Sequence, residues 1–246
     1  MTTRLISIVA LIGLWQVAAH FADPRLLPGP IKVFATMRSE AASGALFAAL
    51  GVTLARVAAA FVLAMAAGSA IGYAMGRNPL FDRVADPWIV VLLNLPALVI
   101  IVLAYIWVGL NEAAAIGAVA LNKLPITVVT IREGVRALDA RLDEMARVFG
   151  FSPARRLAHV VAPQLAPFFA AATRAGLSLV WKIVLVVELM GRPNGVGYEI
   201  NVAFQLFDVR LLLAYALPFT AIMLIVETLV VQPFERHVSR WRPRAA

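Results

Sequence analysis

Residues 144–163 read EMARVFGFSPARRLAHVVAP, a charged segment that lies between two long apolar stretches of the chain. The whole chain is 62% hydrophobic and 15% charged, with a mean hydropathy of +0.86. A soluble globular domain typically carries about 25% charged residues, so this composition predicts a protein embedded in a bilayer. In such a protein, a connection with its own helix signals and several arginines indicates a folded surface on the aqueous side of the membrane.

Apolar runs on both sides of this segment are long enough to cross a hydrocarbon core of about 30 Å, which requires roughly 20 helical residues. They predict an all-α, polytopic protein with about six transmembrane helices, at residues 5–22, 57–75, 87–110, 113–131, 164–190 and 211–231. The first run is short and Ala18 and Ala19 follow its centre, so a secretory signal is the alternative there. Trp15 and His20 favour a retained helix end. No soluble domain stands apart, and residues 1–246 are predicted to form a single transmembrane domain.

The positions of Lys and Arg predict the orientation, because cytoplasmic connections of membrane proteins carry more of them. The connections on one side carry the larger set: Arg4, Arg77, Arg83, Arg132, Arg136, Arg141, Arg147, Arg155, Arg156, Arg236, Arg240, Arg242 and Arg244. The alternate connections carry the smaller set: Arg25, Lys32, Arg38, Arg56, Arg192 and Arg210. Both termini and the 144–163 segment are therefore predicted to be cytoplasmic.

Several function classes find no support in the sequence. The absence of cysteine excludes disulfides and Cys-ligated metal sites, and His20, His159 and His237 are too scattered to predict a metal site. There is no phosphate-binding Gly-Lys-Ser/Thr loop, no G-x-S-x-G and no H-E-x-x-H, so no catalytic residue is predicted and this chain is not expected to hydrolyse ATP. The net charge of +8 is spread among the connections, which argues against nucleic-acid binding.

The first half of the 144–163 region predicts a short helix from Asp139 to Phe149. Its apolar residues share one side: Leu142, Met145, Ala146 and Phe149. Gly150 follows, at the position where a residue in the left-handed conformation commonly ends a helix. The chain is therefore expected to turn at Gly150.

A second helix is predicted immediately after the turn. Ser152 is placed to cap its N-terminus, Pro153 suits its first position, and Pro163 marks its end, where the next span begins. Its apolar residues lie at helical spacing: Ala154, Leu157, Ala158 and Val161. The polar side of the two helices offers these residues to water: Asp143, Glu144, Arg147, Arg155, Arg156 and His159.

This segment resembles the cytoplasmic EAA loop of bacterial ABC importer permeases of the binding-protein-dependent type I. The matching residues are Glu144, Met145, Ala146, Gly150, Val160, Ala162 and Pro163, at the spacing of the family pattern. Met145 stands where the family usually has alanine, and Ala162 where it usually has leucine. The resemblance extends over most of the chain, from LLPGP at residue 26 to AGLSLVWKIVLVVELMGRPNGVGYEI ending at residue 200. It is nearest to the branch that imports nitrate, aliphatic sulfonates and taurine.

The resemblance implies a MetI-like permease fold and a transport subunit rather than an enzyme, in a bacterial inner membrane. It implies that residues 135–163 couple to an ATPase through these positions: Glu144, Met145, Ala146, Gly150, Ser152, Pro153, Arg155, Arg156 and Pro163. It also implies two ATPase subunits that bind ATP and Mg²⁺, a second copy of the chain, an extracytoplasmic solute-binding protein and surrounding lipid. No cofactor is expected in this chain. The competing interpretation of the loop charges is local pairing of Glu144 with Arg141 or Arg147.

Charged residues inside the predicted spans need an explanation, because a central charge costs about 2.5–3.5 kcal/mol on insertion. In the span at residues 164–190 the candidates for lining a translocation pathway are Arg174, Ser178, Trp181, Lys182 and Glu188. The competing interpretation is structural: Arg174 reaches the cytoplasmic surface, and Glu188 pairs with a basic residue or caps the outer loop. Lys123 and Glu227 are candidate partners of this set. The basic residues favour a small, anionic solute such as nitrate, a sulfonate or taurine.

A different transport class is the main alternative, namely a stand-alone ion-coupled carrier that uses Glu188 and Glu227 as carboxylate relays.

The sequence contains two further patterns that each allow more than one interpretation. The small residues Ala64, Gly68, Gly72 and Gly76 recur every four positions, which favours close helix packing, within one subunit or between two copies. Pro96, Pro125 and Pro218 fall inside predicted spans and remove backbone donors there.

Overall fold

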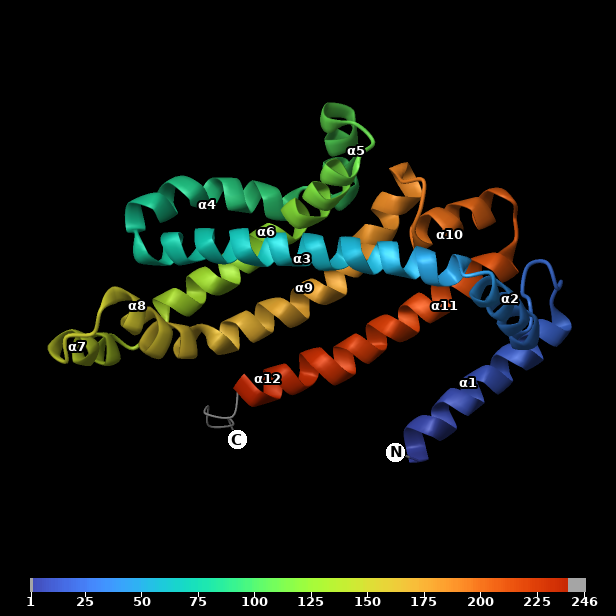
Figure 1. Cartoon of the computed structure of the whole chain (residues 1–246), viewed down its shortest axis with the longest axis horizontal. Helices are drawn as coiled ribbons and strands as arrows, with labels where there is room; N and C mark the ends of the chain where they lie inside the picture. Colours follow the sequence, from blue (N-terminus) through green and yellow to red (C-terminus); the bar gives the residue numbers. More distant parts are fainter. Residues whose placement is uncertain (1, 239–246) are drawn as a thin grey trace. The chain divides into compact units, whose positions relative to one another are not determined.

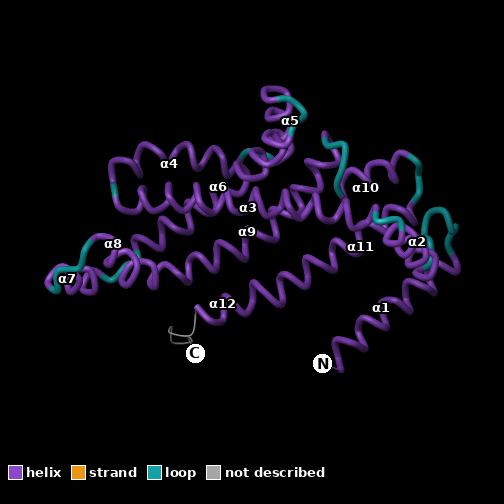
Figure 2. Tube along the Cα trace, in the orientation of Figure 1, coloured by secondary structure: helices purple, strands orange, loops and turns teal. Residues whose placement is uncertain are grey.

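The structure, a computed structural model, describes residues 2–238, and every regular element in that range is helical, which confirms the predicted all-α class (Figure 1). The α-helices are α1 Thr2–Phe21, α2 Pro30–Ala42, α3 Ala45–Arg77, α4 Pro79–Asn94, α5 Ala97–Val108, α6 Glu112–Arg136, α7 Ala140–Val148, α8 Pro153–Arg156, α9 Ala162–Gly191, α10 Val196–Gln205, α11 Val209–Val226 and α12 Gln232–Val238. Two π-helical segments complete the described chain, η1 Leu157–Val161 and η2 Glu227–Val231. Figure 2 shows that the remaining loops are short.

The chain divides into two compact units, and the division falls within α3, α9 and α11. One unit contains the residues up to Ala55 together with Leu185–Met223. The other contains Arg56–Val184 together with the residues from Leu224 onward. The first unit therefore holds the connection between α9 and α10, and the second holds the 144–163 segment.

Most of the predicted spans are present as long apolar helices. In the described part of the chain, four stretches are long and apolar enough to cross a membrane: Ala45–Arg77, Glu112–Arg136, Pro153–Gly191 and Val209–Arg236. The bent pair α4 and α5 makes a fifth if it is counted as one span. The run at residues 5–22 forms α1, whose described apolar part, Val9–Phe21, is shorter than the other spans.

The run predicted as one span over residues 87–110 is broken, which corrects the sequence interpretation. α4 and α5 meet at an angle of 101°. Proline disfavours the helical conformation of the residue before it, and Leu95, which precedes Pro96, is extended with φ −73° and ψ 126°. Pro125 and Pro218, in contrast, lie inside the continuous helices α6 and α11.

The stripe of small residues at positions 64–76 lets α3 pack closely against α6 within the second unit. A Cβ atom added at Gly72 would lie 2.5 Å from the carbonyl oxygen of Val128, and one added at Gly68 would lie 2.8 Å from Cβ of Thr127. Neither position leaves room for a side chain. These two glycines therefore serve packing within one subunit.

Two apolar clusters give the second unit its core near the 144–163 segment. One joins α6 to η1 and the start of α9 through Ile131, Val135, Val161 and Leu165. The other joins α3, α4 and α6 through Met75, Ile89 and Val128. The start of α9 is thus attached to a packed helical base.

Candidate coupling surface

The predicted helix at the start of the loop is present as α7 and begins with a side-chain cap. The carboxylate of Asp139 accepts a hydrogen bond of 2.8 Å from the N–H of Arg141. The N–H of Asp139 in turn donates to Gln164 Oε1 at 2.9 Å, which ties the start of α7 to α9. An N-cap of this kind stabilises a helix by about 1 kcal/mol.

The turn after α7 is a Schellman motif around Gly150, as the sequence predicted. The N–H of Phe151 donates to the carbonyl oxygen of Ala146 at 2.9 Å, and the N–H of Gly150 donates to that of Arg147 at 3.0 Å. Gly150 has φ +65°, and no atom lies within 4 Å of a Cβ added there. Glycine is therefore required for its backbone conformation and not for lack of space.

The second helix starts as predicted but does not end at Pro163. Ser152 Oγ accepts a hydrogen bond of 3.3 Å from the N–H of Arg155, and Pro153 occupies the first helical position. After α8 the chain continues through η1 into α9 as one helical stretch, Pro153–Gly191.

The π-helical segment η1 has a physical cause in the proline that follows it. Proline lacks an N–H, and its ring would clash with the carbonyl of the residue four positions earlier, here His159. The wider π turn, in which the N–H of Ala162 donates to the carbonyl oxygen of Leu157, relieves that clash. The expected end of the helix at Pro163 is thus replaced by a widened turn, and α8 remains continuous with the span.

Ion pairs hold α7 and α8 together as a bracket, a name used below for residues 139–156. Asp143 lies 3.1 Å from the guanidinium of Arg147 on its own helix and 2.9 Å from that of Arg156 on α8. The guanidinium of Arg155 lies 4.4 Å from the ring centroid of Phe151. These contacts hold α7 and α8 against each other.

The outer side of the bracket exposes apolar side chains. Val148 is 85% exposed and Phe149 71%, and Leu142 and Met145 are also exposed, as is Leu157, just after the bracket, at 51%. Glu144 is exposed as well, and it forms no ion pair with any described residue, since Arg147 pairs with Asp143 instead. The local pairing of Glu144 that the competing interpretation predicted is therefore absent from the described part of the chain.

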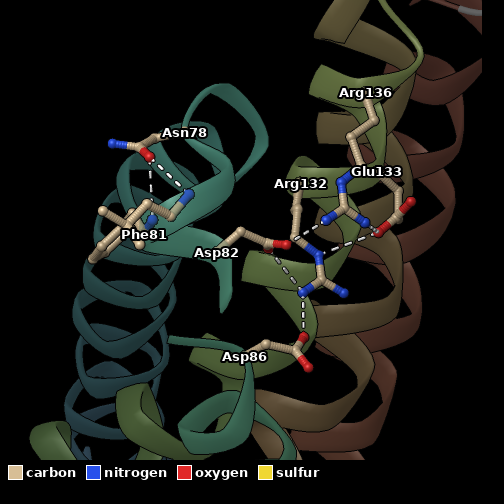
Figure 3. Close-up of polar contacts among 8 residues, drawn as sticks. Asn78, Phe81, Asp82, Asp86, Arg132, Glu133 and Arg136 are labelled. Atoms are coloured by element: carbon tan, nitrogen blue, oxygen red, sulfur yellow. Dashed lines mark hydrogen bonds and ion pairs between the residues drawn. The ribbon is translucent and has the colours of Figure 1, made fainter. Parts of the chain in front are cut away.

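A charge network that the sequence interpretation missed fixes the end of α6, from which the bracket departs (Figure 3). Arg132 bonds Asp86 and lies 3.3 Å from Asp82, and Arg136 lies 2.6 Å from Asp82 and 3.0 Å from Glu133. The signal was present, because the two aspartates on α4 and the two arginines on α6 each lie four positions apart. Their pairing nevertheless depends on how α4 packs against α6.

The candidate pathway residues Arg174, Ser178 and Lys182 on α9 each contact another residue of the chain. Arg174 is 53% exposed and lies 2.8 Å from Glu235 and 3.5 Å from Glu227, so the predicted partnership with Glu227 is present. Ser178 Oγ donates to the carbonyl oxygen of Ala175 at 3.1 Å. Lys182 is exposed, and its ammonium lies 5.6 Å from the ring centroid of Trp181.

Glu188, near the other end of α9, is fully buried and anchors the connection to α10. Its Oε2 accepts hydrogen bonds from the hydroxyl of Thr53 at 2.9 Å and from the N–H of Gly197 at 2.8 Å. Thr53 Oγ1 also accepts from the N–H of Val196 at 2.8 Å. These contacts match the capping alternative given for Glu188.

Lys123, the other suggested partner, is fully buried in the second unit between α6 and α9. Its Nζ donates to Thr127 Oγ1 and to the carbonyl oxygen of Ala172, both at 3.0 Å, and lies 5.4 Å from the ring centroid of Phe61. Lys123 therefore contacts the backbone of α9.

The chain is similar to permease proteins of bacterial transport systems. The model of the family described as binding-protein-dependent transport system inner membrane component matches residues 60–241. SsuC, a candidate aliphatic sulfonates transport permease protein of Bacillus subtilis, is 29% identical over 94% of this chain and 84% of its own length. The taurine transport system permease protein TauC of Escherichia coli is 24% identical over 98% of this chain and 90% of its own length.

Two further proteins extend the comparison. The bicarbonate transport system permease protein CmpB of Synechococcus elongatus is 26% identical over 82% of this chain and 76% of its own length. A crystal structure of an amino acid ABC transporter covers 81% of this chain and 97% of the compared chain, with a TM-score of 0.65 and 21% identity. That structural likeness supports the same fold.

Proposed function

Because this chain belongs to the family of binding-protein-dependent transport system inner membrane components, we propose that its bracket docks on the ATP-hydrolysing subunit of an importer. The chain is a multi-pass permease subunit of an ABC transporter with the predicted MetI-like fold, as the family and the relatives indicate. The proposal concerns three further points: which residues couple the chain to the ATPase, which solute crosses the membrane, and which partner proteins assemble with the chain.

One observation carries the docking proposal, namely that ion pairs join the two helices of the bracket while apolar surface on it stays exposed. Asp143 satisfies two arginines within the bracket, whereas Val148 and Phe149 remain open to solvent. A preformed surface with apolar anchors binds a partner at a lower entropic cost than a flexible loop. Within this surface, Glu144, Met145, Arg155 and the turn at Gly150 are proposed as the contacts.

The mechanism follows from how the bracket is attached. α8 is continuous with α9, so a displacement of the bracket on closure of the ATPase pair moves the span itself. The salt bridges of Arg132 and Arg136 to Asp82 carry the same displacement from α6 to α4. The bracket thus acts as a lever between two states of the transporter, one open outward and one open inward.

The proposed assembly contains two copies of this chain, two ATPase subunits and an extracytoplasmic solute-binding protein. ATP and Mg²⁺ are held by the ATPase, and no cofactor is proposed for this chain. The distribution of Lys and Arg supports an orientation with both termini and the bracket in the cytoplasm. Residues 1–246 are proposed to act as one transmembrane permease domain.

The proposed cargo is a small anionic solute, in line with the sulfonate, taurine and bicarbonate named for the relatives. Lys182, with its exposed ammonium, is the strongest candidate for lining the pathway on α9. Ser178 and Trp181 lie on the same helix, and Arg174 adds positive charge near its ion pairs with Glu227 and Glu235. Glu188 remains a candidate only if the pathway reaches its buried position.

The docking proposal is tested with the complete transporter in proteoliposomes. Glu144→Ala and Gly150→Val are each expected to reduce ATP-driven uptake by about tenfold or more, because they remove a contact and distort the turn. Membrane insertion should be unchanged. Arg141→Gln is the matched control, since Arg141 is exposed on the same helix and lies outside the proposed contacts. Unchanged uptake together with unchanged ATPase association in both variants would contradict the proposal.

The proposed pathway has its own test. Lys182→Gln is expected to raise the KM for uptake of an anionic solute severalfold while assembly with the ATPase stays normal. Lys182→Arg, which keeps the charge, should retain most of the uptake. If Lys182→Gln transports with normal kinetics, Lys182 does not line the pathway.

The alternative of a stand-alone carrier is not favoured. Glu188 is committed to Thr53 and Gly197, and Glu227 lies beside Arg174, so neither carboxylate is placed as a free proton relay. The purified chain is expected to show no uptake under an ion gradient until the ATPase, ATP and binding protein are added.

A further inference from the structure

In the first unit, the connection from α1 to α2 lies near the connection from α10 to α11 (Figure 1). Residues of both connections, and of the helices that follow them, line a basic pocket. Its volume is about 500 Å³. Arg25, Lys32 and Arg210 line it together with a single carboxylate, that of Asp208. The pocket therefore carries an excess of positive charge.

Asp208 offsets little of that excess because it is engaged at the start of α11. Its Oδ1 accepts hydrogen bonds from the N–H of Arg210 at 3.0 Å and from that of Leu211 at 3.2 Å. Although burial opposes the shift, these hydrogen bonds and the guanidinium of Arg210 lower the pKa of Asp208. Asp208 thus stays charged and is paired with Arg210.

The other two cations are available to a ligand. Arg25 uses its backbone N–H to bond Asp23 at 2.8 Å, but its side chain forms no ion pair with a described residue. The side chain of Lys32 likewise has no carboxylate partner in the described range. Both side chains are exposed where they line the pocket.

An aromatic ring stands at the pocket in an unusual backbone position. The N–H of Phe207 donates to the carbonyl oxygen of Phe204 at 3.1 Å, and the N–H of Asp208 donates to that of Ala203 at 2.9 Å. This is the same Schellman pattern as at Gly150. Phe207 occupies the left-handed position with φ +53°, a conformation that disfavours side chains other than that of glycine. The ring is nevertheless 83% exposed. The exposed ring therefore adds apolar surface beside the cations of the pocket.

The surroundings supply an apolar track that leads to the pocket. α1 ends at Phe21, which is 84% exposed, and Leu14 and Val17 on the same helix are 71% and 59% exposed. Leu206, which also lines the pocket, is 68% exposed. α1 ends and the apolar helix α11 begins beside the pocket, and the ends of membrane-spanning helices lie at the level of the lipid headgroups.

We propose that this pocket binds the phosphodiester of an anionic phospholipid through Arg25, Lys32 and Arg210, with an acyl chain along the exposed apolar residues of α1. Paired cations at a membrane surface attract anionic headgroups, and the apolar track distinguishes a lipid from free phosphate. In the proposed orientation this lipid belongs to the outer leaflet. It would hold the outer ends of α1 and α11 together.

Native mass spectrometry of the full chain in detergent tests the proposal, with phosphatidylglycerol, phosphatidylcholine and inorganic phosphate as probes. The chain is expected to prefer phosphatidylglycerol to phosphatidylcholine by about fivefold or more, and Arg25→Gln and Lys32→Gln should each weaken that binding by about fivefold. Arg38→Gln is the matched control, because Arg38 is exposed on α2 and does not line the pocket. It should leave the preference unchanged.

Phe207→Gly separates a lipid from a free anion. Glycine suits φ +53°, so this variant should unfold at a higher temperature than the wild type and yet bind phosphatidylglycerol about threefold more weakly. Equal binding of the two lipids, or unchanged binding in the Arg25 and Lys32 variants, would overturn the site. Displacement of the lipid by millimolar phosphate, with no effect of Phe207→Gly, would overturn the lipid as its occupant.

Discussion

The regions before and after α9, called its two ends below, use the same pair of residue types, a glutamate and a glycine with positive φ, in opposite ways. Before α9, Glu144 is exposed and Gly150 has open space around it. At the other end, Glu188 is fully buried, and a Cβ added at Gly195 would lie 2.5 Å from its carboxylate. The first glutamate faces solvent, whereas the second is enclosed by the chain itself.

This difference shows that a residue pattern does not by itself reveal whether a charge serves a partner or the fold. The decisive quantity is what surrounds the carboxylate. Glu188 accepts hydrogen bonds from Thr53 and Gly197 within the first unit, whereas Glu144 accepts none from any described residue. Substitutions at the two ends should therefore separate stability from coupling.

Gly195→Ala is expected to have the largest effect on stability, about 4 kcal/mol. Alanine at φ +105° is strained, and its methyl group would displace Glu188 from its hydrogen bonds. The apparent midpoint of thermal unfolding in detergent should fall by about 10 °C or more. Gly117→Ala is the control, since no atom lies within 4 Å of the added Cβ and α6 should gain from alanine. Equal midpoints for the two variants would refute the packing argument.

Glu188→Ala should cost less, about 2 kcal/mol, because it leaves the buried N–H of Gly197 without its acceptor, whereas the hydroxyl of Thr53 can still donate to the carbonyl oxygen of Ala49 at 3.1 Å. Glu188→Gln keeps an acceptor oxygen and should recover about half of that loss. Glu144→Ala is the matched substitution at the exposed end and should leave the unfolding midpoint unchanged. The comparison between the two ends fails if Glu144→Ala destabilises the protein as much as Glu188→Ala.

Asp143→Ala should destabilise the bracket locally by about 1.5 kcal/mol, since it removes one exposed and one half-buried ion pair. Hydrogen exchange of the amides in residues 140–156 should quicken by about tenfold while exchange in α6 stays the same. Uptake should fall because a loosened bracket transmits less movement. Unaltered exchange in the bracket would show that Arg147 and Arg156 do not hold it together.

Gly150→Ala is expected to have the smallest effect on stability, about 1 kcal/mol, because only its backbone conformation is at stake. The variant should unfold within about 4 °C of the wild type. Gly150→Asn tolerates the left-handed conformation better and should be closer still. A loss as large as that of Gly195→Ala would mean that the turn at Gly150 is also packed against other residues.

The parts of the fold that depend on local chemistry could be predicted from the sequence. The cap at Ser152, the turn at Gly150 and the helix before it follow from neighbouring residues, and the structure contains all three. The pairing of Asp82 with Arg132 depends on the packing of two helices, and the sequence analysis missed it. The burial of Glu188 was likewise beyond reach, because helical periodicity identifies a face and not what covers it.

The effects of proline on the helices were only partly predicted from the sequence. η1 ends two residues before Pro163, and η2 ends two residues before Pro233, so both widened turns accommodate a proline ring. A sequence analysis that treats proline only as a helix end predicts neither. At Pro96, in contrast, the long apolar run predicted one continuous span, whereas the helix is broken there.

The 101° bend at Pro96 affects which part of the subunit's surface can contact lipid tails. α5 has 12 residues, a length of about 18 Å, and is too short to cross a bilayer alone. At the bend the last carbonyl groups of α4 lose their helical partners, and hydrocarbon cannot hydrate them. Irregular backbone at membrane depth is stable only beside protein or water. The bend therefore marks a part of this subunit's surface that lipid tails do not wet.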